Sequence, residues 1–426
     1  WESRQVDYSN AFCQASLPAG EELFIELPAH YKPKGYEHLD VVLRLKKSLY
    51  GTVTAPKLFY EHLCKGMAAC GFEPSKSDPC LFMHKVDKVM VLTYIDDQIW
   101  IAKDPRLIDK HIKTLKSNGY LLTQEPDGNL FGFLGIEVRR EGKQVELTQK
   151  GLIKKVINFV GLDENSSTVR DTPAATDPLG ADADGEPFDE EWNYAAAVGM
   201  CLYVSSNTRC DIQFAVHQCA RFTHNPKKSH GQALKRICRY LIKTKDRGLL
   251  FTPDKSQGLD LWVDADFAGL YGHEDEQDPV CVKSRTGFTR TLFGCPILWS
   301  SKLQAEITLS STAAEYVAFS MGMRELVPMW RLLGEIGEAL SLGYLSPSMV
   351  RSTVFEDNQG CISLVNVPKM SPRNKYLSLK YHWFRSHIGK DIVAQYVRSE
   401  LQKADILTKG LPEAQFLVIR KLLMGW

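Results

Sequence analysis

The sequence predicts a mixed α/β (α+β) protein with more than one domain. Three patterns support this prediction: short apolar runs alternate with helical patterns up to about residue 161, a helical pattern covers residues 192–247, and strands followed by helices return from residue 259. In the last of these regions we expect a strand at 284–298 and a helix at 312–326. The expected core positions of the helical region are Leu202, Phe214, Val216, Leu234, Ile237 and Leu241. The 426 residues correspond to two or three domains. With 44% hydrophobic and 24% charged residues, the chain has the composition of a globular protein, which excludes a disordered or fibrous one.

The charge balance excludes a global attraction to nucleic acid. Lys and Arg number 52 and Asp and Glu 51, so nucleic-acid binding would have to depend on local basic patches. No apolar run approaches the roughly 18 residues of a membrane helix, and no signal peptide is recognisable. The eleven cysteines include no C-x-x-C pair, which fits a reduced, intracellular compartment and argues against a zinc site or a disulfide framework.

The elements of the first region follow from local patterns. Residues 89–95 and 99–102 are apolar and read as two strands that flank an acidic turn. Residues 57–69 have helical spacing, with Gly71 just past the end. The chain starts at Trp1 rather than Met and runs directly into a strand-like segment, so we expect a piece of a longer polypeptide.

The acidic turn, Asp96 and Asp97, has two interpretations. A solvated hairpin turn is the simpler one because Asp is common in turns, although Asp-Asp-Gln lacks the Gly or Asn that two-residue turns favour. Two carboxylates about 4 Å apart repel by about 4 kcal/mol at an effective dielectric constant near 20, so a site that gathers them needs a cation. Magnesium is the expected ion because it prefers hard oxygen ligands. Asp7 offers a third carboxylate.

Many segments, in their order along the chain, resemble the reverse transcriptase region of copia-type LTR retrotransposon polyproteins. The metal-binding palm motifs correspond to Gln-Val-Asp-Tyr-Ser-Asn-Ala-Phe at 5–12 and Tyr-Ile-Asp-Asp at 94–97. The other matching segments are Leu-Tyr-Gly at 49–51, Ala-Pro at 55–56, Gly-Phe at 71–72, Asp-Pro-Cys-Leu-Phe at 78–82, Phe-Leu-Gly-Ile-Glu-Val at 133–138, Thr-Arg-Cys-Asp-Ile at 208–212 and Ala-Asp-Ile-Leu-Thr-Lys at 404–409. The resemblance therefore spans essentially the whole chain.

The resemblance implies a partial reverse-transcriptase palm, a helical thumb/connection and a ribonuclease H-like mixed-sheet domain. The limits are 1–161 for the palm and the start of the thumb, 162–191 for an acidic flexible linker, 192–258 for the thumb/connection, 259–411 for the ribonuclease H-like domain and 412–426 for a C-terminal tail. The family's fingers strands, which bind the incoming triphosphate, lie upstream of the position where Trp1 begins. We therefore expect this chain alone to polymerise poorly or not at all.

In the palm, the resemblance assigns the two metals to Asp7 and Asp96, with Asp97 as a weaker third carboxylate, in the two-metal scheme of phosphoryl transfer. Phe12 corresponds to the steric gate that favours deoxynucleotides, with a core aromatic as the alternative. Gly51 corresponds to a template contact, where the missing side chain permits close approach. Residues 133–136 resemble the primer grip and are equally compatible with a buried strand. The substrate-binding candidates are Phe12, Gly51, Tyr94, Phe133, Leu134 and Gly135.

Four further candidate metal ligands lie in the last third of the chain: Asp264, Glu315, Asp357 and Asp405. Each has a structural alternative, since Glu315 fits a capping box at 312–315 and the two later Asp residues fit helix starts, where Asn358 competes with Asp357. Together they follow the order of the ribonuclease H constellation, strand, helix, strand end and final helix. Segments 310–316 and 357–360 match its copia-type version.

The resemblance implies that these four acids hold two magnesium ions and activate water against the RNA strand of an RNA·DNA hybrid. Asp266 competes with Asp264 for the first position because residues two apart on a strand share a face. It ranks second, since Val263-Asp264 occupies the place of the family's strand-end Asp.

Two basic stretches are candidate nucleic-acid contacts. Residues 369–390 contain bases and aromatic rings but no acid, a composition that neutralises phosphates and stacks on sugars or bases, with a solvated helix face as the alternative. Residues 221–247 form a second stretch, expected to cover the hybrid between the two sites. The nucleic-acid-binding candidates are Arg373, Lys375, Lys380, His382 and Arg385.

The chain departs from the family pattern at Cys210, where proline is usual, at 375–378, where Lys-Tyr-Leu-Ser replaces Lys-His-Ile-Asp, and in an enlarged loop at 269–278. Every candidate metal ligand is retained.

We therefore expect an RNA-directed DNA polymerase with ribonuclease H activity. Its cofactors would be two Mg²⁺ per site, with Mn²⁺ as a substitute. Its partners would be an RNA template, a DNA primer, the hybrid and deoxynucleoside triphosphates, with no membrane. It would act in a cytoplasmic virus-like particle or the nucleus. The alternative is a catalytically silent remnant that binds hybrid or single strands.

Overall fold

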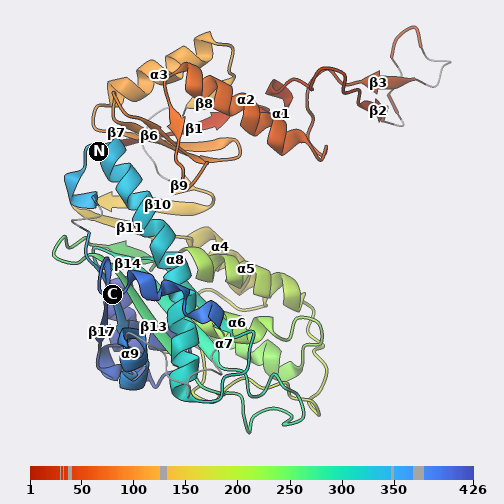
Figure 1. The fold of residues 1–426 in the computed structure, drawn as a ribbon. Coiled ribbons are helices and arrows are strands. Elements are labelled where there is room, and N and C mark those ends of the chain that lie inside the picture. The colour runs from red at the N-terminus through yellow and green to blue at the C-terminus, as the bar shows by residue number, and fades with distance from the viewer. Residues whose placement is uncertain (29, 32, 37–40, 125–131, 347–349, 368–378) are drawn as a thin grey trace. The chain divides into compact units, whose positions relative to one another are not determined.

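The computed structural model describes residues 1–28, 30–31, 33–36, 41–124, 132–346, 350–367 and 379–426 (Figure 1). The chain divides into two compact units. The smaller unit comprises residues 1–133 and 332–346, and the larger unit comprises residues 134–331 and 347–426. The predicted mixed α/β class is confirmed. None of the described helices combines the length and the apolar character needed to cross a lipid bilayer.

The smaller unit is built on a six-stranded sheet with the order β4-β5-β6-β7-β1-β8. Its strands are β1 (Glu2–Tyr8), β4 (Glu73–Pro74), β5 (Leu81–His84), β6 (Val89–Tyr94), β7 (Asp97–Ala102) and β8 (Leu122–Gln124). Its other elements are α1 (Ala11–Gln14), α2 (Ala55–Ala69), α3 (Pro105–Ser117), the paired strands β2 (Phe24–Glu26) and β3 (Val42–Arg44), β9 (Gly132–Phe133) and the 3₁₀ helix η2 (Gly343–Leu345). The predicted acidic hairpin is thus β6-β7, and the predicted helix 57–69 is α2.

Helices α2 and α3 cover one face of this sheet, as Figure 1 shows. In α2, Phe59, Leu63 and Met67 recur every four residues and are buried, because this spacing places them on one side of a helix. Asp104 caps α3 by accepting the N–H of Arg106 at 3.0 Å. The sheet contributes side chains such as Trp100 to this core.

Strand alternation gives the same sheet a second apolar face. In β5, Phe82 points into the core under α2 and α3, whereas Leu81 and Met83 pack with Ala339 and the other residues of the smaller unit's second cluster. Burial of each such side chain contributes about 1.5–3 kcal/mol. Part of α8 (Ser311–Ala339) therefore belongs to the smaller unit.

Helix α8 is longer than the predicted helix 312–326. It continues through Pro328 to Ala339. A proline within a helix removes one backbone hydrogen bond, and here the apolar side chains beyond it are buried against β5 and β6. This packing compensates for the lost hydrogen bond. A local sequence pattern cannot predict it, because the packing partners are distant in sequence.

The larger unit contains a mixed five-stranded sheet with the order β15-β14-β13-β16-β17. Its strands are β13 (Leu259–Asp266), β14 (Arg285–Leu292), β15 (Cys295–Leu303), β16 (Ser352–Glu356) and β17 (Ile392–Tyr396). The first three are antiparallel neighbours, while β16 is parallel to β13 and to β17. Strands β10 (Ile136–Glu141), β11 (Gln144–Thr148) and β12 (Leu249–Phe251) form a separate antiparallel group.

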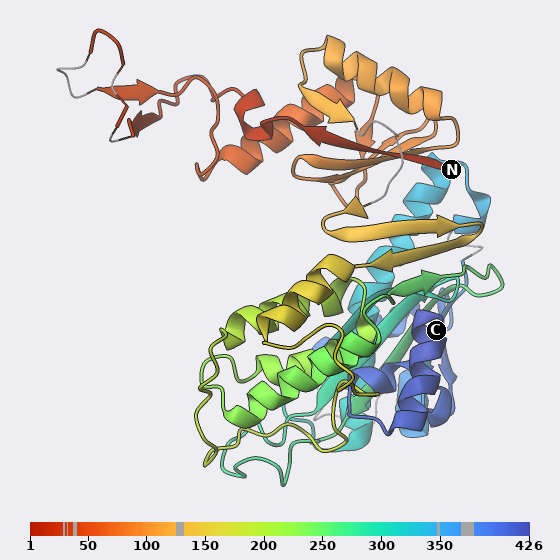
Figure 2. The same ribbon diagram turned by 180° about the vertical axis from the view of Figure 1, so that it is seen from behind.

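The helices of the larger unit are α4 (Lys150–Phe159), α5 (Tyr194–Asn207), α6 (Gln213–Ala220), α7 (Lys228–Lys243), α9 (Gln359–Asn366) and α10 (Glu413–Met424), with part of α8. Helices α4 to α7 and α10 share one core beside these strands, on the side best seen in Figure 2. The 3₁₀ helices are η1 (Cys210–Ile212), η4 (Leu379–Tyr381), η5 (Trp383–His387), η6 (Ser399–Leu401) and η7 (Lys403–Leu407). The core of α4 to α7 and α10 includes the predicted positions Val216, Leu234, Ile237 and Leu241.

The predicted strand 284–298 is a hairpin of two strands, β14 and β15. Phe293 and Gly294 connect them with φ values of 53° and 81°. A two-residue hairpin turn of this kind needs positive φ at both positions, which Asn-Gly or Asp-Gly usually supplies. Because phenylalanine is unusual at the first position of such a turn, the sequence did not predict it.

The acidic segment 162–191, predicted as a flexible linker, has no regular helix or strand but is tied to α7. Asp171 pairs with Lys243, and Glu190 pairs with Lys235 at 2.8 Å. The N–H of Phe188 donates to the carbonyl of Pro226 at 3.1 Å. The segment therefore lies against α7 in the larger unit and partly neutralises the second basic stretch. The domain limits drawn from the sequence stay a prediction.

The Thr-Arg-Cys-Asp segment at 208–211 forms a buried ion pair. Arg209 donates to both carboxylate oxygens of Asp211, at 2.9 and 2.8 Å, and Tyr240 donates to the same group at 2.6 Å. Arg209 and Asp211 are fully buried. The motif therefore has a structural role, joining η1 to α7.

Candidate active sites

The first candidate site lies at one end of the β1-β7 pair. Asp7 on β1 is directly opposite Asp97 on β7. The N–H of Tyr8 donates to the carbonyl of Asp96 at 3.0 Å, which holds the acidic turn beside β1. Antiparallel pairing thus brings Asp7 beside the adjacent acids Asp96 and Asp97, which come much later in the sequence.

These three acids are near enough to influence one another and remain accessible. Burial and the charge of Asp96 raise the pKa of Asp7. Burial, followed by the charges of Asp96 and Asp7, raises the pKa of Asp97. Asp7 is exposed, and Asp96 and Asp97 are half-buried. The arrangement presents negative charge to solvent, where a cation and a phosphate can reach it.

The predicted gate and template residues lie near this site. The Phe12 ring, on α1, is 4.6 Å from the Tyr50 ring and 6.1 Å from the Phe59 ring, measured between centroids. Burial and the charge of Asp96 raise the pKa of Tyr50. Gly51 follows with a φ of 94°, a conformation that favours glycine. Tyr50 was part of a matching segment but not a predicted site residue.

The remaining substrate-binding candidates are on β6 and near β9. Tyr94 ends β6, is exposed, and pairs with Asp97 across the hairpin. Phe133 ends β9, and Leu134 and Gly135 follow with φ values of 51° and 74°. The carbonyl of Leu134 accepts a hydrogen bond from Tyr203. The predicted primer grip is therefore a tight turn rather than a plain buried strand.

The second candidate site gathers acids from four elements of the larger unit. Asp264 lies on β13, Glu315 on α8, Asp357 directly after β16 and Asp405 on η7. Asp264, Asp357 and Asp405 offer carboxylate oxygens that all lie within 4.8 Å of one another. Glu315, Glu356 and Asp357 form a second trio within the same limit. Asp357 belongs to both trios, so the site offers two adjoining cation positions with one shared ligand.

Glu356 is the acid that sequence reasoning missed. It ends β16, beside Asp357, and its Oε1 accepts the N–H of Asn358 at 3.0 Å. The other oxygen, Oε2, is buried without a hydrogen-bond partner, as is Oε2 of Glu315. No motif singled out Glu356. Its position immediately before Asp357, at the end of a predicted strand, could have marked it as a candidate ligand.

Burial makes the second site strongly electrostatic. The exposed fractions of Asp264, Glu315, Glu356 and Asp405 are 3%, 6%, 0% and 1%. Burial, then the charge of Glu356, raises the pKa of Glu315 well above its usual value. Burial, then the charge of Asp264, raises the pKa of Asp405 to about 7. Three buried carboxylate oxygens of this site have no hydrogen-bond partner within the described part of the chain: Oε2 of Glu315, Oε2 of Glu356 and Oδ1 of Asp405. Such oxygens are the donors that a hard divalent cation prefers.

Lys409 supplies positive charge at this site. Its Nζ lies 3.1 Å from Oδ1 of Asp405 and 4.0 Å from Oδ2 of Asp264. Burial lowers the pKa of Lys409, but the two carboxylates outweigh burial and the pKa is raised. Oδ1 of Asp405 has no hydrogen bond of good geometry, so this contact is an ion pair only. Thr408 donates to Asp264.

The structural alternatives for these acids fare differently. Ser310, not Thr312, caps α8 by accepting the N–H of Ala313 at 3.1 Å, so Glu315 is not part of a capping box. Asn358, not Asp357, caps α9. Asp405 does not open the final helix as expected, because it lies in η7 and α10 starts at Glu413.

Asp266, the competitor of Asp264, belongs to neither trio among the described residues. Its carboxylate lies under the following loop, where a Cβ on Gly269 would meet it at 1.7 Å. Burial raises the pKa of Asp266, and the charge of Lys409 opposes this. A role in holding the loop accounts for these contacts.

The basic stretch 369–390 is described only in part, and Arg373 and Lys375 lie outside the described residues. Lys380 pairs with Glu306. Nδ1 of His382 is 2.8 Å from the hydroxyl of Tyr316, and Arg385 is half-buried in η5. These turns pack on α8, where Phe384 is fully buried. The described part is therefore not a solvated helix face.

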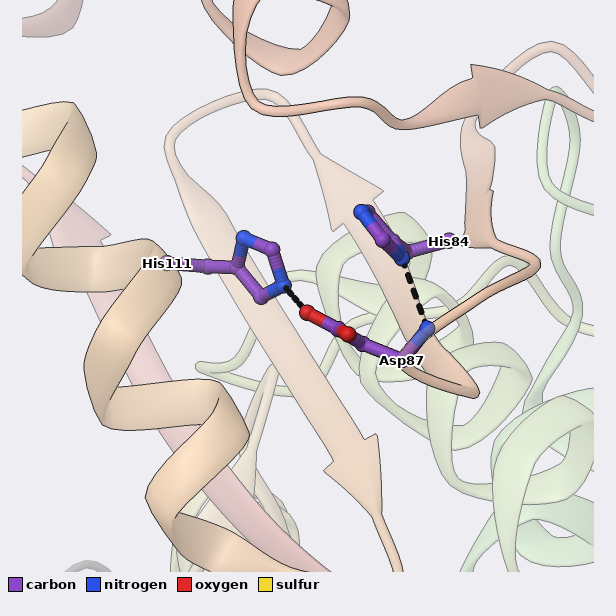
Figure 3. A group of neighbouring side chains, drawn as sticks. All are labelled: His84, Asp87 and His111. Atoms are coloured by element: carbon purple, nitrogen blue, oxygen red, sulfur yellow. Dashed lines mark hydrogen bonds and ion pairs between the residues drawn. The ribbon is translucent and has the colours of Figure 1, made fainter.

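A third group, His84, Asp87 and His111, also offers ligand atoms within 4.8 Å of one another (Figure 3). Oδ2 of Asp87 is 2.8 Å from Nε2 of His111 and 2.9 Å from Nζ of Lys110. Nδ1 of His84 accepts the N–H of Asp87 at 2.9 Å. A neutral ring that accepts at Nδ1 carries its proton on Nε2, which leaves no lone pair for an ion. These contacts satisfy the group as a structural tie between the β5-β6 turn and α3.

Comparison with known proteins supports the resemblance seen in the sequence. Residues 1–174 match the family model described as "Reverse transcriptase (RNA-dependent DNA polymerase)". The chain is 31% identical, over 98% of its length, to "Retrovirus-related Pol polyprotein from transposon RE1" of Arabidopsis thaliana. It is 29% identical, over 99% of its length, to the corresponding polyprotein from transposon TNT 1-94 of Nicotiana tabacum.

The chain spans 27% and 31% of the length of these two relatives. It is also 23% identical to the putative transposon Ty5-1 protein of Saccharomyces cerevisiae, over 75% of this chain and 100% of that protein. The resemblance to copia-type Pol polyproteins is thereby confirmed. Residues 1–174 match the reverse transcriptase family model, and the chain as a whole is similar to the Pol polyproteins of copia-type retrotransposons.

Proposed function

We propose that the chain is the reverse transcriptase and ribonuclease H region of a copia-type retrotransposon. It would copy RNA into DNA at the β1-β7 site and cleave the RNA strand of an RNA·DNA hybrid at the second site. The observation that carries the proposal is the pair of buried carboxylate trios that share Asp357. The reverse transcriptase family of residues 1–174 supports the polymerase half.

At the second site, the chain's own residues would provide binding and charge. Asp264, Asp357 and Asp405 would hold one magnesium ion, and Glu315 and Glu356 with Asp357 would hold another. Bound magnesium supplies activation of the attacking water and neutralisation of the leaving oxygen. Lys409 would balance part of the negative charge and favour the ionised forms of Asp264 and Asp405, against the effect of burial.

At the first site, Asp7, Asp96 and Asp97 would hold the cations that orient the primer hydroxyl and the triphosphate. Phe12 would exclude a ribose 2′-hydroxyl, with Tyr50 packed against its ring. The other proposed contacts are Gly51 and Tyr94 for the template and nucleotide, Phe133, Leu134 and Gly135 for the primer, and Arg373, Lys375, Lys380, His382 and Arg385 for the hybrid.

The test is magnesium-dependent cleavage of a labelled RNA strand in an RNA·DNA hybrid by the purified chain. We expect Asp264→Asn to abolish cleavage. Asp266→Asn is the matched control, because it removes an acid two residues away on the same strand and outside both trios. Equal loss in both variants, or no cleavage by folded wild-type protein, would contradict the proposal. Binding of hybrid without cleavage would then favour a silent, nucleic-acid-binding remnant.

Polymerisation is tested separately by primer extension with magnesium and deoxynucleotides. Any extension should disappear in Asp96→Asn and persist in Asp264→Asn, since the two sites lie in different units. Extension that survives Asp96→Asn would remove the β1-β7 site from the proposal.

A further inference from the structure

A third candidate site is a pocket of about 390 Å³ in the larger unit. The segment 170–179 lines one side, and helices α6 and α7 line the other. This volume falls within the range of small-ligand sites, roughly 300–1,000 Å³. The pocket shares no lining residue with either acidic site.

Three arginines line this pocket: Arg170 from the acidic segment and Arg236 and Arg239 from α7. Positions 236 and 239 are three apart, so both side chains lie on the same face of the helix. Only one acid, Asp177, is among the lining residues. The pocket therefore concentrates positive charge in a chain whose total charge is close to neutral.

The arginine charges are poorly matched within the protein. Arg236 donates to the hydroxyl and the carbonyl of Thr172, at 2.8 and 3.3 Å, and both acceptors are uncharged. Among the described residues, the guanidinium groups of Arg170 and Arg239 make no hydrogen bond or ion pair, and Nε of Arg239 is buried without an acceptor. Burial and then the charge of Arg170 lower the pKa of Arg236.

Other bases on the same helix make the contrast clear. Lys235 pairs with Glu190 and Lys243 pairs with Asp171. The acidic segment therefore neutralises these lysines but not the arginines that line the pocket. A guanidinium group forms two parallel hydrogen bonds with a phosphate. Three arginines that face one space without an acidic partner among the described residues, two of them half-buried, thus favour a phosphate group more than a solvated monovalent anion.

The remaining wall of the pocket is partly apolar. Leu179 and Phe214 contribute apolar surface to it, beside the amides of Gln218 and Gln232. A ligand that carries a phosphate alone would leave this surface without a partner. A nucleotide combines a phosphate with a flat ring that can cover such a surface.

We propose that this pocket binds a nucleotide phosphate, with Arg170, Arg236 and Arg239 on the phosphate and the base against Leu179 and Phe214. The nucleotide can be free in solution or can be the 5′-phosphorylated end of a nucleic-acid strand. The site is separate from both acidic sites and does not depend on their chemistry.

The test is isothermal titration of the full chain in EDTA, which suppresses magnesium-dependent binding at the acidic sites. The probes are ADP, adenosine, inorganic phosphate and a short oligonucleotide with or without a 5′-phosphate. We expect ADP to bind at least about tenfold more tightly than adenosine or phosphate. Tight binding of the phosphorylated oligonucleotide in place of ADP would assign the strand end as the source.

Variants locate the binding. Arg170→Gln combined with Arg239→Gln should weaken the bound probe at least about tenfold. Arg239→Lys, which keeps the charge but not the two-pronged geometry, should weaken it less. Arg324→Gln, an exposed arginine of α8, is the matched control and should bind normally. Arg170→Gln alone tests the site without a folding risk, because its guanidinium group has no partner among the described residues.

Three results would overturn the proposal. They are no binding of ADP or of the phosphorylated strand, equal binding of adenosine and ADP, and unchanged binding in a double variant that unfolds at the wild-type temperature.

Discussion

The two acidic sites differ in how the fold holds their carboxylates. Asp7, Asp96 and Asp97 come from neighbouring antiparallel strands and are exposed or half-buried. The acids of the second site come from β13, α8, β16 and η7 and are, apart from Asp357, almost completely buried. Among the described residues, the second site forms two compact trios, whereas the first three acids do not form one.

This difference teaches where each site obtains its stability. A hairpin end costs little to assemble, because water screens its charges, so bound substrate and cation must complete it. A buried group of acids from four elements is costly without a cation, because desolvation and mutual repulsion add. The second site should therefore depend on metal for stability as well as for activity.

The largest expected effect is on cleavage by Asp357→Asn, because Asp357 is shared by both trios. Cleavage of the RNA strand should fall at least about 100-fold. Titration with Mn²⁺ should lose binding at both positions of the second site. Loss of only one position would show that the trios are independent, and Asp266→Asn again serves as the control.

The next effect separates two kinds of buried acid. Asp211 is as buried as Glu315, but Arg209 neutralises it. Asp211→Asn should lower the free energy of unfolding by about 3–5 kcal/mol, because it leaves the Arg209 charge unpaired. Glu315→Gln should leave stability in EDTA unchanged or raise it. Urea unfolding of both variants checks this, and an equal loss in both would make Glu315 a structural acid.

The pH dependence of metal-free stability should follow the second site. The pKa of Asp405 is raised to about 7, so between its unfolded value near 4 and this value the folded state binds more protons than the unfolded state. Stability in EDTA should therefore fall as the pH rises through this window, and magnesium should restore it at pH 8. Unfolding at pH 5 and pH 8, with EDTA or magnesium, measures both. A free energy of unfolding that does not change with pH in EDTA would mean that burial of these acids does not destabilise the folded state.

The smallest effect is expected at the first site. Asp97→Asn should change the free energy of unfolding by less than about 0.5 kcal/mol, because the side chain is half-buried and screened by water. Its magnesium-dependent change in melting temperature should also be smaller than that of the second site. A loss comparable with that of Asp211→Asn would erase the distinction between the two sites.

Local physics is what the sequence by itself determined. Alternation located β6 and β7, helical spacing and Gly71 delimited α2, and Asn358 was one of two candidate caps for α9. Such features depend on residues within a few positions of one another. The order of the motifs along the chain also indicated the family and made Asp264, Glu315, Asp357 and Asp405 candidate metal ligands.

Only the tertiary structure decided which groups meet. It added Glu356 to the second candidate site, placed Asp357 in both acidic trios and tied the acidic segment to α7. It also extended α8 beyond Pro328 and turned the chain at Phe293. These outcomes depend on contacts between residues far apart in sequence. Periodicity reports which face of an element is apolar, but not which distant element will pack on that face.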